Sequence, residues 1–572
     1  MGAEKLPQRI GRFDDYPVIG VFATCDPRID KDSRVRAGNI IRMTADLLSQ
    51  KLKIPDGTAV PVVYSDILID GEIQADQVAQ QFKRRGVNIL VGVPDTWAFP
   101  QLTVLSLLSH FLKDTPINFT CGNSGPKPGV VFTHAVSGAI SQYGGLIHIN
   151  VGNWPDSGLE PVMSEKTLRA LVDWAFAAVT YQGLKGRRVV IFGHDSMGME
   201  TALPHILATR NTFGLEITRL DMKLLADMLQ KKAYHQKELR DLRKWLQDQA
   251  GPRIELKSDS DHERLNQSLA MYLIVRDLLQ ELRAVGGGFM SQLEWGSDQR
   301  GIPLPVADIM ESLFNSTFDH QGKKTVLPFA TEADVQALLT MLFMTYLSGG
   351  NPPLFMDFRK VWEPWELRAL AKKLKIKLTG KTIWEKRGLV DGDNSGSASF
   401  DWAAKPGTPI TEIMKKISFP LADPYYFPGL GNSVTFVSPG GIEGIAARLA
   451  YSSLSGMFSL IWDEAVTVEL PAKLSRAVCH TSTSTWPHTF VTPLHATMGE
   501  YKHYAPANHF HMTWNLPTAR LQYWMDLANV LSVTPWKEMP LYREGIDRPL
   551  PLLYLLNGGE SQAKIRRRRG GS

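Results

Sequence analysis

Cysteine is scarce in this sequence of 572 residues. The three cysteines, Cys25, Cys121 and Cys479, are far apart and form no C-x-x-C pair. This spacing argues against a disulfide framework, a zinc knuckle and an iron–sulfur cluster. Scarce, unpaired cysteine fits a reducing compartment, so we expect the protein in the cytoplasm.

Long apolar runs are also lacking. The longest, Ala337 to Leu347, is too short to span a bilayer and is typical of a buried helix. The first twenty residues contain no continuous apolar segment of the kind that a secretory signal needs. We therefore expect no membrane role.

Excess charge is absent from most of the chain. The net charge is +5, and the tail at residues 564–572 carries five positive side chains, so the rest of the sequence is formally neutral. A neutral body gives no basic surface for nucleic acid, and we expect no nucleic-acid partner. We interpret the basic tail as a solvated, disordered end.

Two common catalytic motifs are missing as well. No glycine-rich segment ends in the G-K-[ST] of a phosphate-binding loop, and no G-x-S-x-G is present. GGGFM at 286–290 and GLGNS at 429–433 are typical of tight turns, and Ser196 of a helix cap.

What the sequence does contain is a regular alternation of strands and helices. It predicts two N-terminal α/β domains with parallel sheets and a β-rich C-terminal domain, at residues 1–164, 165–345 and 346–572. The expected strands of the first two domains include 16–24, 59–69, 87–94, 116–122, 146–152 and 187–193. The expected helices are 37–52, 75–85, 102–112, 164–181, 224–246 and 261–282.

The stretch PPLFMDFRKVW at 352–362 predicts a buried strand with Asp357 at its centre. A carboxylate among apolar side chains needs a partner. One candidate is a salt bridge to Arg359, two residues on and so on the same strand face. The other is a functional role, and the stretch alone favours the salt bridge.

A second acid precedes this strand. Thr331 and Asp334 have the spacing of a capping box, which predicts a helix from Glu332 to about Leu347. The segment SGGNPP then reverses the chain, which permits Glu332 and Asp357 to converge. The alternative for Glu332 is that it only complements the helix dipole.

Histidines follow at the far end of the chain. His509 and His511 lie two residues apart, on one face if the stretch is extended. Two carboxylates and one imidazole would form a hard ligand set suited to Mn²⁺ or Mg²⁺. From the residue types, a metal site is one option among several.

Several segments, in order along nearly the whole chain, resemble motifs of the L-fucose isomerase family. ATEAD at 330–334 is similar to the family's A-T-E-N-D, and DFRKVW at 357–362 to its D-V-R-T-Y-W. Further similar segments are SMG at 196–198, NSTFD at 315–319, NSGSA at 394–398, TVELP at 467–471, STWP at 484–487 and ANH at 507–509.

The resemblance implies an aldose–ketose isomerase that moves a proton between C2 and C1 of L-fucose or D-arabinose. It implies that Glu332, Asp357 and His509 ligate one Mn²⁺, for which Mg²⁺ or Co²⁺ could substitute, and that both carboxylates act as acid or base. No organic cofactor is expected. A sugar-binding or regulatory protein that kept the fold without catalysis is the alternative.

The resemblance also implies a homohexamer, with Trp97 reaching the active site of a neighbouring subunit. Arg28, Gln292, Ser395 and Asn508 are further expected sugar contacts, although each could be an ordinary turn or cap residue. Asn432 stands where the family has an aromatic residue, so we expect a changed sugar contact and leave the preferred sugar open.

Overall fold

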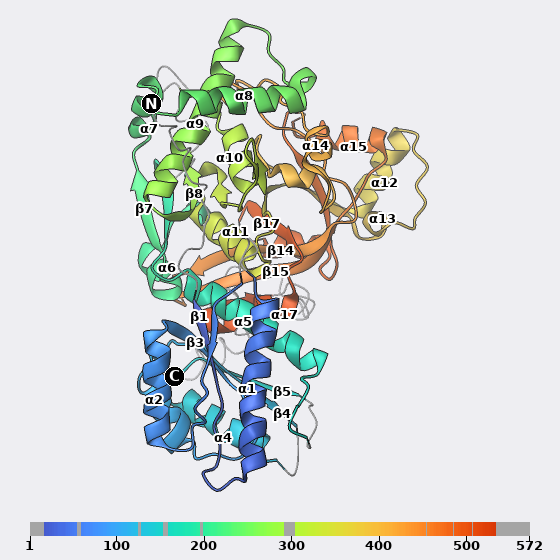
Figure 1. Cartoon of the computed structure of the whole chain (residues 1–572). Helices are drawn as coiled ribbons and strands as arrows, with labels where there is room; N and C mark the ends of the chain where they lie inside the picture. The colour runs from blue at the N-terminus through green and yellow to red at the C-terminus, as the bar shows by residue number, and fades with distance from the viewer. Residues whose placement is uncertain are drawn as a thin grey trace, which may run out of the picture. The chain divides into compact units, whose positions relative to one another are not determined.

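The computed structural model describes residues 17–53, 59–123, 127–152, 158–194, 198–290, 304–453, 455–483, 485–505 and 507–533. They form two compact units (Figure 1). The N-terminal unit comprises the described residues of Phe13–Lys185 and Pro517–Ala528. The main unit comprises those of Gly186–Leu516 and Asn529–Ser572.

A parallel sheet with the strand order β2-β1-β3-β4-β5 forms the centre of the N-terminal unit. Its strands are β1 (Val18–Phe22), β2 (Val62–Tyr64), β3 (Val87–Gly92), β4 (Ile117–Gly122) and β5 (Ile147–Gly152). Its helical elements are α1 (Lys31–Lys51), α2 (Glu72–Arg84), η1 (Gln101–Leu105), α3 (Ser106–Leu108), α4 (Gly129–Gln142), α5 (Glu165–Gly183) and α17 (Thr518–Ala528).

Helix α17 joins this unit from more than 300 residues further along the chain. It packs against α5, and Nη2 of Arg520 lies 2.9 Å from Oδ1 of Asp173. Both side chains are mostly buried. The late segment therefore completes the N-terminal unit by helix packing and an ion pair.

The main unit begins with a second parallel sheet, in the order β11-β8-β6-β7. Strand β8 is glycine-rich, and a Cβ on Gly287 would lie 2.7 Å from the Phe329 ring, so glycine permits this packing. The strands are β6 (Arg188–Phe192), β7 (Glu216–Leu220), β8 (Ala284–Phe289) and β11 (Phe329–Ala330). The helical elements and a small hairpin are η2 (Glu200–Ala202), α6 (Ile206–Phe213), α7 (Met222–Gln230), α8 (Gln236–Ala250), η3 (Gly251–Arg253), α9 (Asp259–Glu281), α10 (Asp308–Asn315), β9 (Phe318–Asp319), β10 (Gly322–Lys323), η4 (Thr331–Ala333) and α11 (Val335–Leu347).

Six of the described strands after residue 350 form a closed antiparallel ring in the order β14-β17-β12-β13-β16-β15, because β14 also pairs with β15. Strand β18 (Leu531–Val533) adds to β15 in parallel. The ring strands are β12 (Leu354–Trp362), β13 (Leu389–Asp393), β14 (Glu443–Ser452), β15 (Met457–Thr467), β16 (His488–Pro493) and β17 (His509–Trp514). The helical elements are α12 (Pro364–Lys373), α13 (Ile383–Arg387), η5 (Phe400–Ala403), α14 (Ile410–Met414), α15 (Ala472–Cys479) and α16 (Met498–Tyr504).

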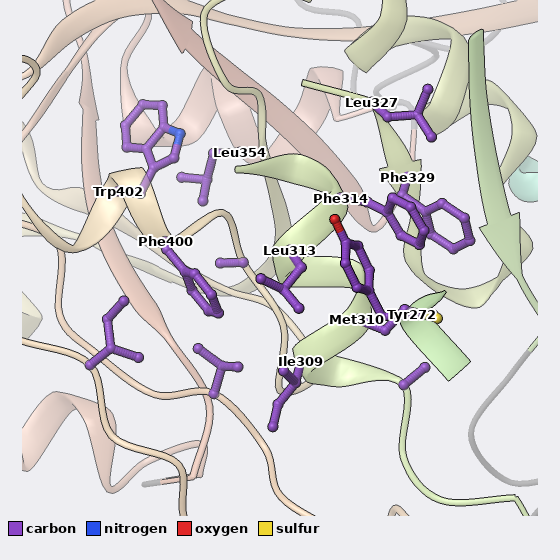
Figure 2. Packing of buried hydrophobic residues seen from close by; sticks show 14 of the residues in the cluster. Tyr272, Ile309, Met310, Leu313, Phe314, Leu327, Phe329, Leu354, Phe400 and Trp402 are labelled. Atoms are coloured by element: carbon purple, nitrogen blue, oxygen red, sulfur yellow. The ribbon is translucent and has the colours of Figure 1, made fainter. Parts of the chain in front are cut away.

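One hydrophobic core connects the parallel sheet of the main unit with the ring. The rings of Phe314 of α10 and Phe329 of β11 are stacked (Figure 2), and their centroids are 4.8 Å apart. Leu354 of β12 and Trp402 of η5 belong to the same buried cluster. Packing is therefore continuous across residue 345, where the sequence suggested a boundary.

The predicted fold class is confirmed, with corrections to single elements. The helix expected over 224–246 is divided into α7 and α8, and the strand expected over 59–69 is reduced to β2. Helix α1 begins at Lys31, because the side chain of Asp30 accepts a hydrogen bond from the backbone N–H of Ser33 and caps it. None of the described helices is both long enough and apolar enough to cross a membrane.

Candidate active site

Strand pairing brings Asp357 and His509 together. β12 and β17 are antiparallel, and Asp357 lies directly opposite His509. Leu354 and Met356 alternate onto the other face of β12, where they join the buried core. Nε2 of His509 lies 3.1 Å from Oδ1 of Asp357, so the sheet register itself sets this contact.

Glu332 reaches the same histidine from a strained turn. Its Oε2 lies 3.2 Å from Nε2 of His509. Glu332 has φ 61° and ψ 23°, and Ala333 has φ 51°, both in the left-handed region that non-glycine residues rarely adopt. Such strain is found mainly where surrounding contacts enforce it, often at functional sites.

The helix after this turn does not start at Glu332, although the sequence predicted that start. Helix α11 begins at Val335, and Glu332 lies in the turn before it. The cap is Asp334, whose Oδ1 accepts a hydrogen bond from the N–H of Ala337 at 2.8 Å. Glu332 therefore lies outside the helix, and its side chain points toward His509 of β17.

Asp334 also orients His509. Its Oδ2 lies 2.7 Å from Nδ1 of the imidazole, and Arg448 of β14 donates to both of its carboxylate oxygens, at 2.8 and 3.1 Å. All three side chains are buried. An Nδ1–H that donates to Asp334 leaves Nε2 directed at Glu332 and Asp357.

Burial and the charges within this cluster shift the pKa values of His509, Glu332 and Asp334. Burial opposes the charged imidazole, but hydrogen bonds to Asp334, Asp357 and Glu332 raise the pKa of His509 well above its ordinary value. Burial also raises the pKa of Glu332, with His509 opposing. Burial alone would raise the pKa of Asp334, yet Arg448 and His509 outweigh it and lower that pKa.

Arg359 does not form the predicted salt bridge with Asp357. Its guanidinium lies over the Trp486 ring, 5.3 Å from the ring centroid, and among the described residues it makes no ion pair with an acid. The half-buried Asp357 instead faces His509 on one side and, in register on β13, Asp393 on the other. The first interpretation of this strand is therefore wrong.

Other polar residues expected at the site have different surroundings. Nδ2 of Asn508 lies 2.9 Å from Nε2 of His509. Ser395 is buried, and its N–H donates to the side chain of Asn394. Asn432 is fully buried, and its amide donates to the carbonyls of Glu255 and Phe419.

Arg28 and Trp97 belong to the N-terminal unit. The guanidinium of Arg28 pairs with Asp26, and Trp97 packs edge-on against Phe99 and Phe132. Gln292, Ser196, Ser484 and the basic tail lie outside the described residues. The expected sugar contacts of Arg28, Trp97 and Gln292 stay predictions.

A small cavity borders the cluster. Glu332 and Thr331 form part of its wall, together with Asp308 and Glu311 of α10 and with apolar side chains such as Met290 and Phe427. Sequence reasoning missed Asp308, Glu311 and Arg448. The only local signal for them is an acidic or basic residue within an otherwise apolar run.

The three converging side chains form a donor set that fits a hard divalent ion. Neighbouring ligands of an octahedral ion with bonds of about 2.1 Å are separated by about 3 Å, close to the 3.1 and 3.2 Å between Nε2 and the two carboxylates. Among the described residues, however, no group of three histidine, cysteine or acidic side chains is already arranged around a metal position. Nε2 of His509 instead contacts the carboxylates of Glu332 and Asp357 directly. Glu332, Asp357 and His509 are thus the residues that could hold an ion.

Comparisons with known proteins cover most of the chain. The family model described as "L-fucose isomerase, first N-terminal domain" matches residues 16–186, and the one described as "L-fucose isomerase, second N-terminal domain" matches residues 188–349. Proteins named L-fucose isomerase from Escherichia coli strains SMS-3-5 and K12/DH10B are 26% identical over 523 residues. Each alignment covers 83% of this chain and 85% of the relative.

Proposed function

We propose that this chain, which belongs to the L-fucose isomerase family, is a divalent-metal-dependent aldose–ketose isomerase acting on L-fucose or a related sugar such as D-arabinose. The convergence of Glu332, Asp357 and His509 carries the proposal, because Nε2 lies within 3.2 Å of both carboxylates. The same three side chains would thus supply both the ligands of the ion and the groups that transfer protons. We propose Mn²⁺ as the ion.

The residues of the chain account for the proton movements. One carboxylate, Glu332 or Asp357, takes the proton from C2 of the open-chain aldose, and the other returns a proton at C1, while the proton of the C2 hydroxyl moves to O1 so that the ketone forms at C2. His509 is held by Asp334, so its Nε2 keeps a fixed direction. The strained turn places Glu332 at the cavity that would hold the sugar.

The ion would contribute by stabilising the negative charge that develops on the two sugar oxygens when the proton leaves. Buried apolar groups support this chemistry. The Phe355 ring lies 4.5 Å from the His509 ring, and Met290 and Phe427 line the cavity. A water-poor site strengthens every electrostatic interaction within it.

The first test is formation of ketose from L-fucose and from D-arabinose, with and without Mn²⁺. We expect turnover that EDTA abolishes, and at least a 100-fold lower kcat in Asp357→Asn, a change on the order of that for a lost acid or base. Calorimetric titration of Mn²⁺ should show weaker binding to Asp357→Asn. A suitable control is Asp463→Asn, which changes another buried aspartate of the ring and should retain activity.

Full activity of metal-free Asp357→Asn would exclude the proposed mechanism. Binding of sugar without any turnover would instead identify a sugar-binding protein. We further propose a cytoplasmic homohexamer, on the basis of the family resemblance and the three unpaired cysteines. Light scattering of the purified protein measures the number of subunits.

A further inference from the structure

Two carboxyl groups on one helix line the wall of the cavity beside Glu332. Asp308 and Glu311 are three residues apart on α10 and so share one helix face. Each is only 3% exposed, and both border the cavity. Acids are almost never buried this deeply unless they have partners, so each requires an explanation.

Glu311 finds its partners within the protein. Its Oε2 accepts hydrogen bonds from Oγ1 of Thr331 at 2.7 Å and from Oγ of Ser397 at 2.8 Å. Thr331 directly precedes the strained Glu332. Glu311 therefore belongs to the support of the catalytic turn.

Asp308 is different, because its Oδ2 is buried without a hydrogen bond. This oxygen lies against Gly396, where a Cβ would approach it to 1.9 Å. Burial and the charge of Glu311 raise the pKa of Asp308 well above its ordinary value, with the nearby Ser433 hydroxyl opposing, yet neither Oδ2 nor the Ser433 Oγ makes a hydrogen bond of acceptable geometry. An unsatisfied buried acceptor is costly, which indicates a donor that arrives with a ligand.

Hydrogen bonds and helix position give these acids an order relative to Glu332. Glu311 binds Thr331, the residue before Glu332, whereas Asp308 lies almost one helical turn away, against Gly396. The same wall includes the apolar side chains of Leu304 and Val306.

A ligand that fits this wall has a carbon chain and several hydroxyl groups. We propose that Asp308 binds the substrate, accepting a hydrogen bond from a hydroxyl on a carbon beyond C2 while Glu332 acts at C1 and C2. This inference rests on the proposed isomerase function and names one of the groups that select the sugar. A sugar lacking that hydroxyl leaves the acceptor unpaired, so the site discriminates against it.

The test combines changes in protein and ligand. We would titrate Mn²⁺-loaded wild type and Asp308→Asn with L-fucitol, the open-chain alcohol of L-fucose, and with its 3-, 4- and 5-deoxy forms. For wild type we expect one missing hydroxyl to weaken binding by about 5- to 100-fold, the range for leaving a buried hydrogen-bond partner unsatisfied. In Asp308→Asn, the penalty for that same hydroxyl should fall to within about threefold, since its acceptor has changed.

Asp401→Asn is the matched control. Asp401 is a buried carboxyl near α10 that accepts hydrogen bonds from Thr317 and Ser399, but it does not line the cavity. It should retain the wild-type penalty at every position. If Asp308→Asn does not fold, as judged by thermal melting, Asp308→Ala replaces it.

Equal penalties in wild type and in the Asp308 variant would overturn the role of Asp308. If wild type produces ketose but shows this result, only the present inference fails. If wild type neither binds L-fucitol nor forms ketose, the proposed function itself fails. The two failures are therefore distinguishable.

Discussion

Asp334 serves two structural purposes with one carboxylate. It caps helix α11 through the N–H of Ala337, and it binds Arg448 and His509. Arg448 is 1% exposed and also donates to the carbonyl of Thr201. The carboxylate therefore neutralises a buried cation and at the same time fixes the imidazole ring.

Removing this carboxylate should strongly destabilise the protein. In Asp334→Ala, the Arg448 guanidinium stays buried without an anion, and we expect a loss of about 3–5 kcal/mol in the free energy of unfolding. Urea denaturation followed by tryptophan fluorescence measures it. The double variant Asp334→Ala/Arg448→Met should recover at least half of the loss, because no unpaired charge remains.

A matched comparison is Asp70→Ala, whose partner Arg34 is 36% exposed. It should cost no more than about 1 kcal/mol, as for other solvent-exposed pairs. Similar losses from Asp334→Ala and Asp70→Ala would contradict the role of burial.

At the scale of elements, strand register and helix ends determine where side chains point. Helix α12 ends at Lys373, and Lys375 follows with φ 57°. The N–H of Ile376 then donates to the carbonyl of Ala371. This left-handed turn after a helix usually contains glycine, since other residues have a Cβ that crowds the backbone.

Lys375→Gly should consequently stabilise the protein, by about 0.5–1 kcal/mol, because the strain exceeds the entropy that glycine adds to the unfolded chain. The melting temperature by calorimetry measures the change. Lys377 is also exposed but has no positive φ, so Lys377→Gly should slightly lower the melting temperature. A lower melting temperature for Lys375→Gly would refute the interpretation.

The same scale explains which parts of the site could be predicted. Asp357 and His509 stand out as polar groups in apolar strands, and period-two patterning places them on one face. The helix start at Glu332 was wrong, because capping by Asp334 competes with a capping box that begins at Thr331. Arg448 and Asp308 could not be found, since their roles depend on contacts across more than 80 residues.

For the whole molecule, alternation of strands and helices predicted the fold class, but the closure of the ring and the return of α17 to the N-terminal unit could not be predicted. Both depend on contacts between segments far apart in sequence. Buried charged side chains also have partners that are far away in the sequence. Glu238 of α8 lies between Arg276 of α9 and His320 of the small hairpin.

This cluster should make the stability of the protein depend on acidity. Burial alone would raise the pKa of Glu238, but Arg276 and His320 outweigh it and lower the pKa from 4.5 to about 2. The unfolded chain thus takes up the proton first, so the stabilisation is complete above about pH 4.5 and is lost as the pH falls toward 2.

Glu238→Gln should be less stable than wild type at pH 7 and should lose less stability between pH 5 and pH 3. Urea midpoints at pH 7, 5, 4 and 3 measure both effects. Glu412→Gln, an exposed change on α14, should follow the wild-type curve. Parallel curves for wild type and Glu238→Gln would contradict the assignment.

The direct pairing of Asp357 with His509 also limits how this gene can change. Inserting one codon between Leu354 and Asp357 would turn the aspartate to the face where Met356 now lies, because side chains alternate along a strand. The turn at 348–353 carries no such alternation, but Asn351 and the Pro352 carbonyl within it are held by Trp514 and Trp402, so its length is constrained by these contacts instead. Among descendants of this sequence, length variation should therefore be absent from β12 and β17.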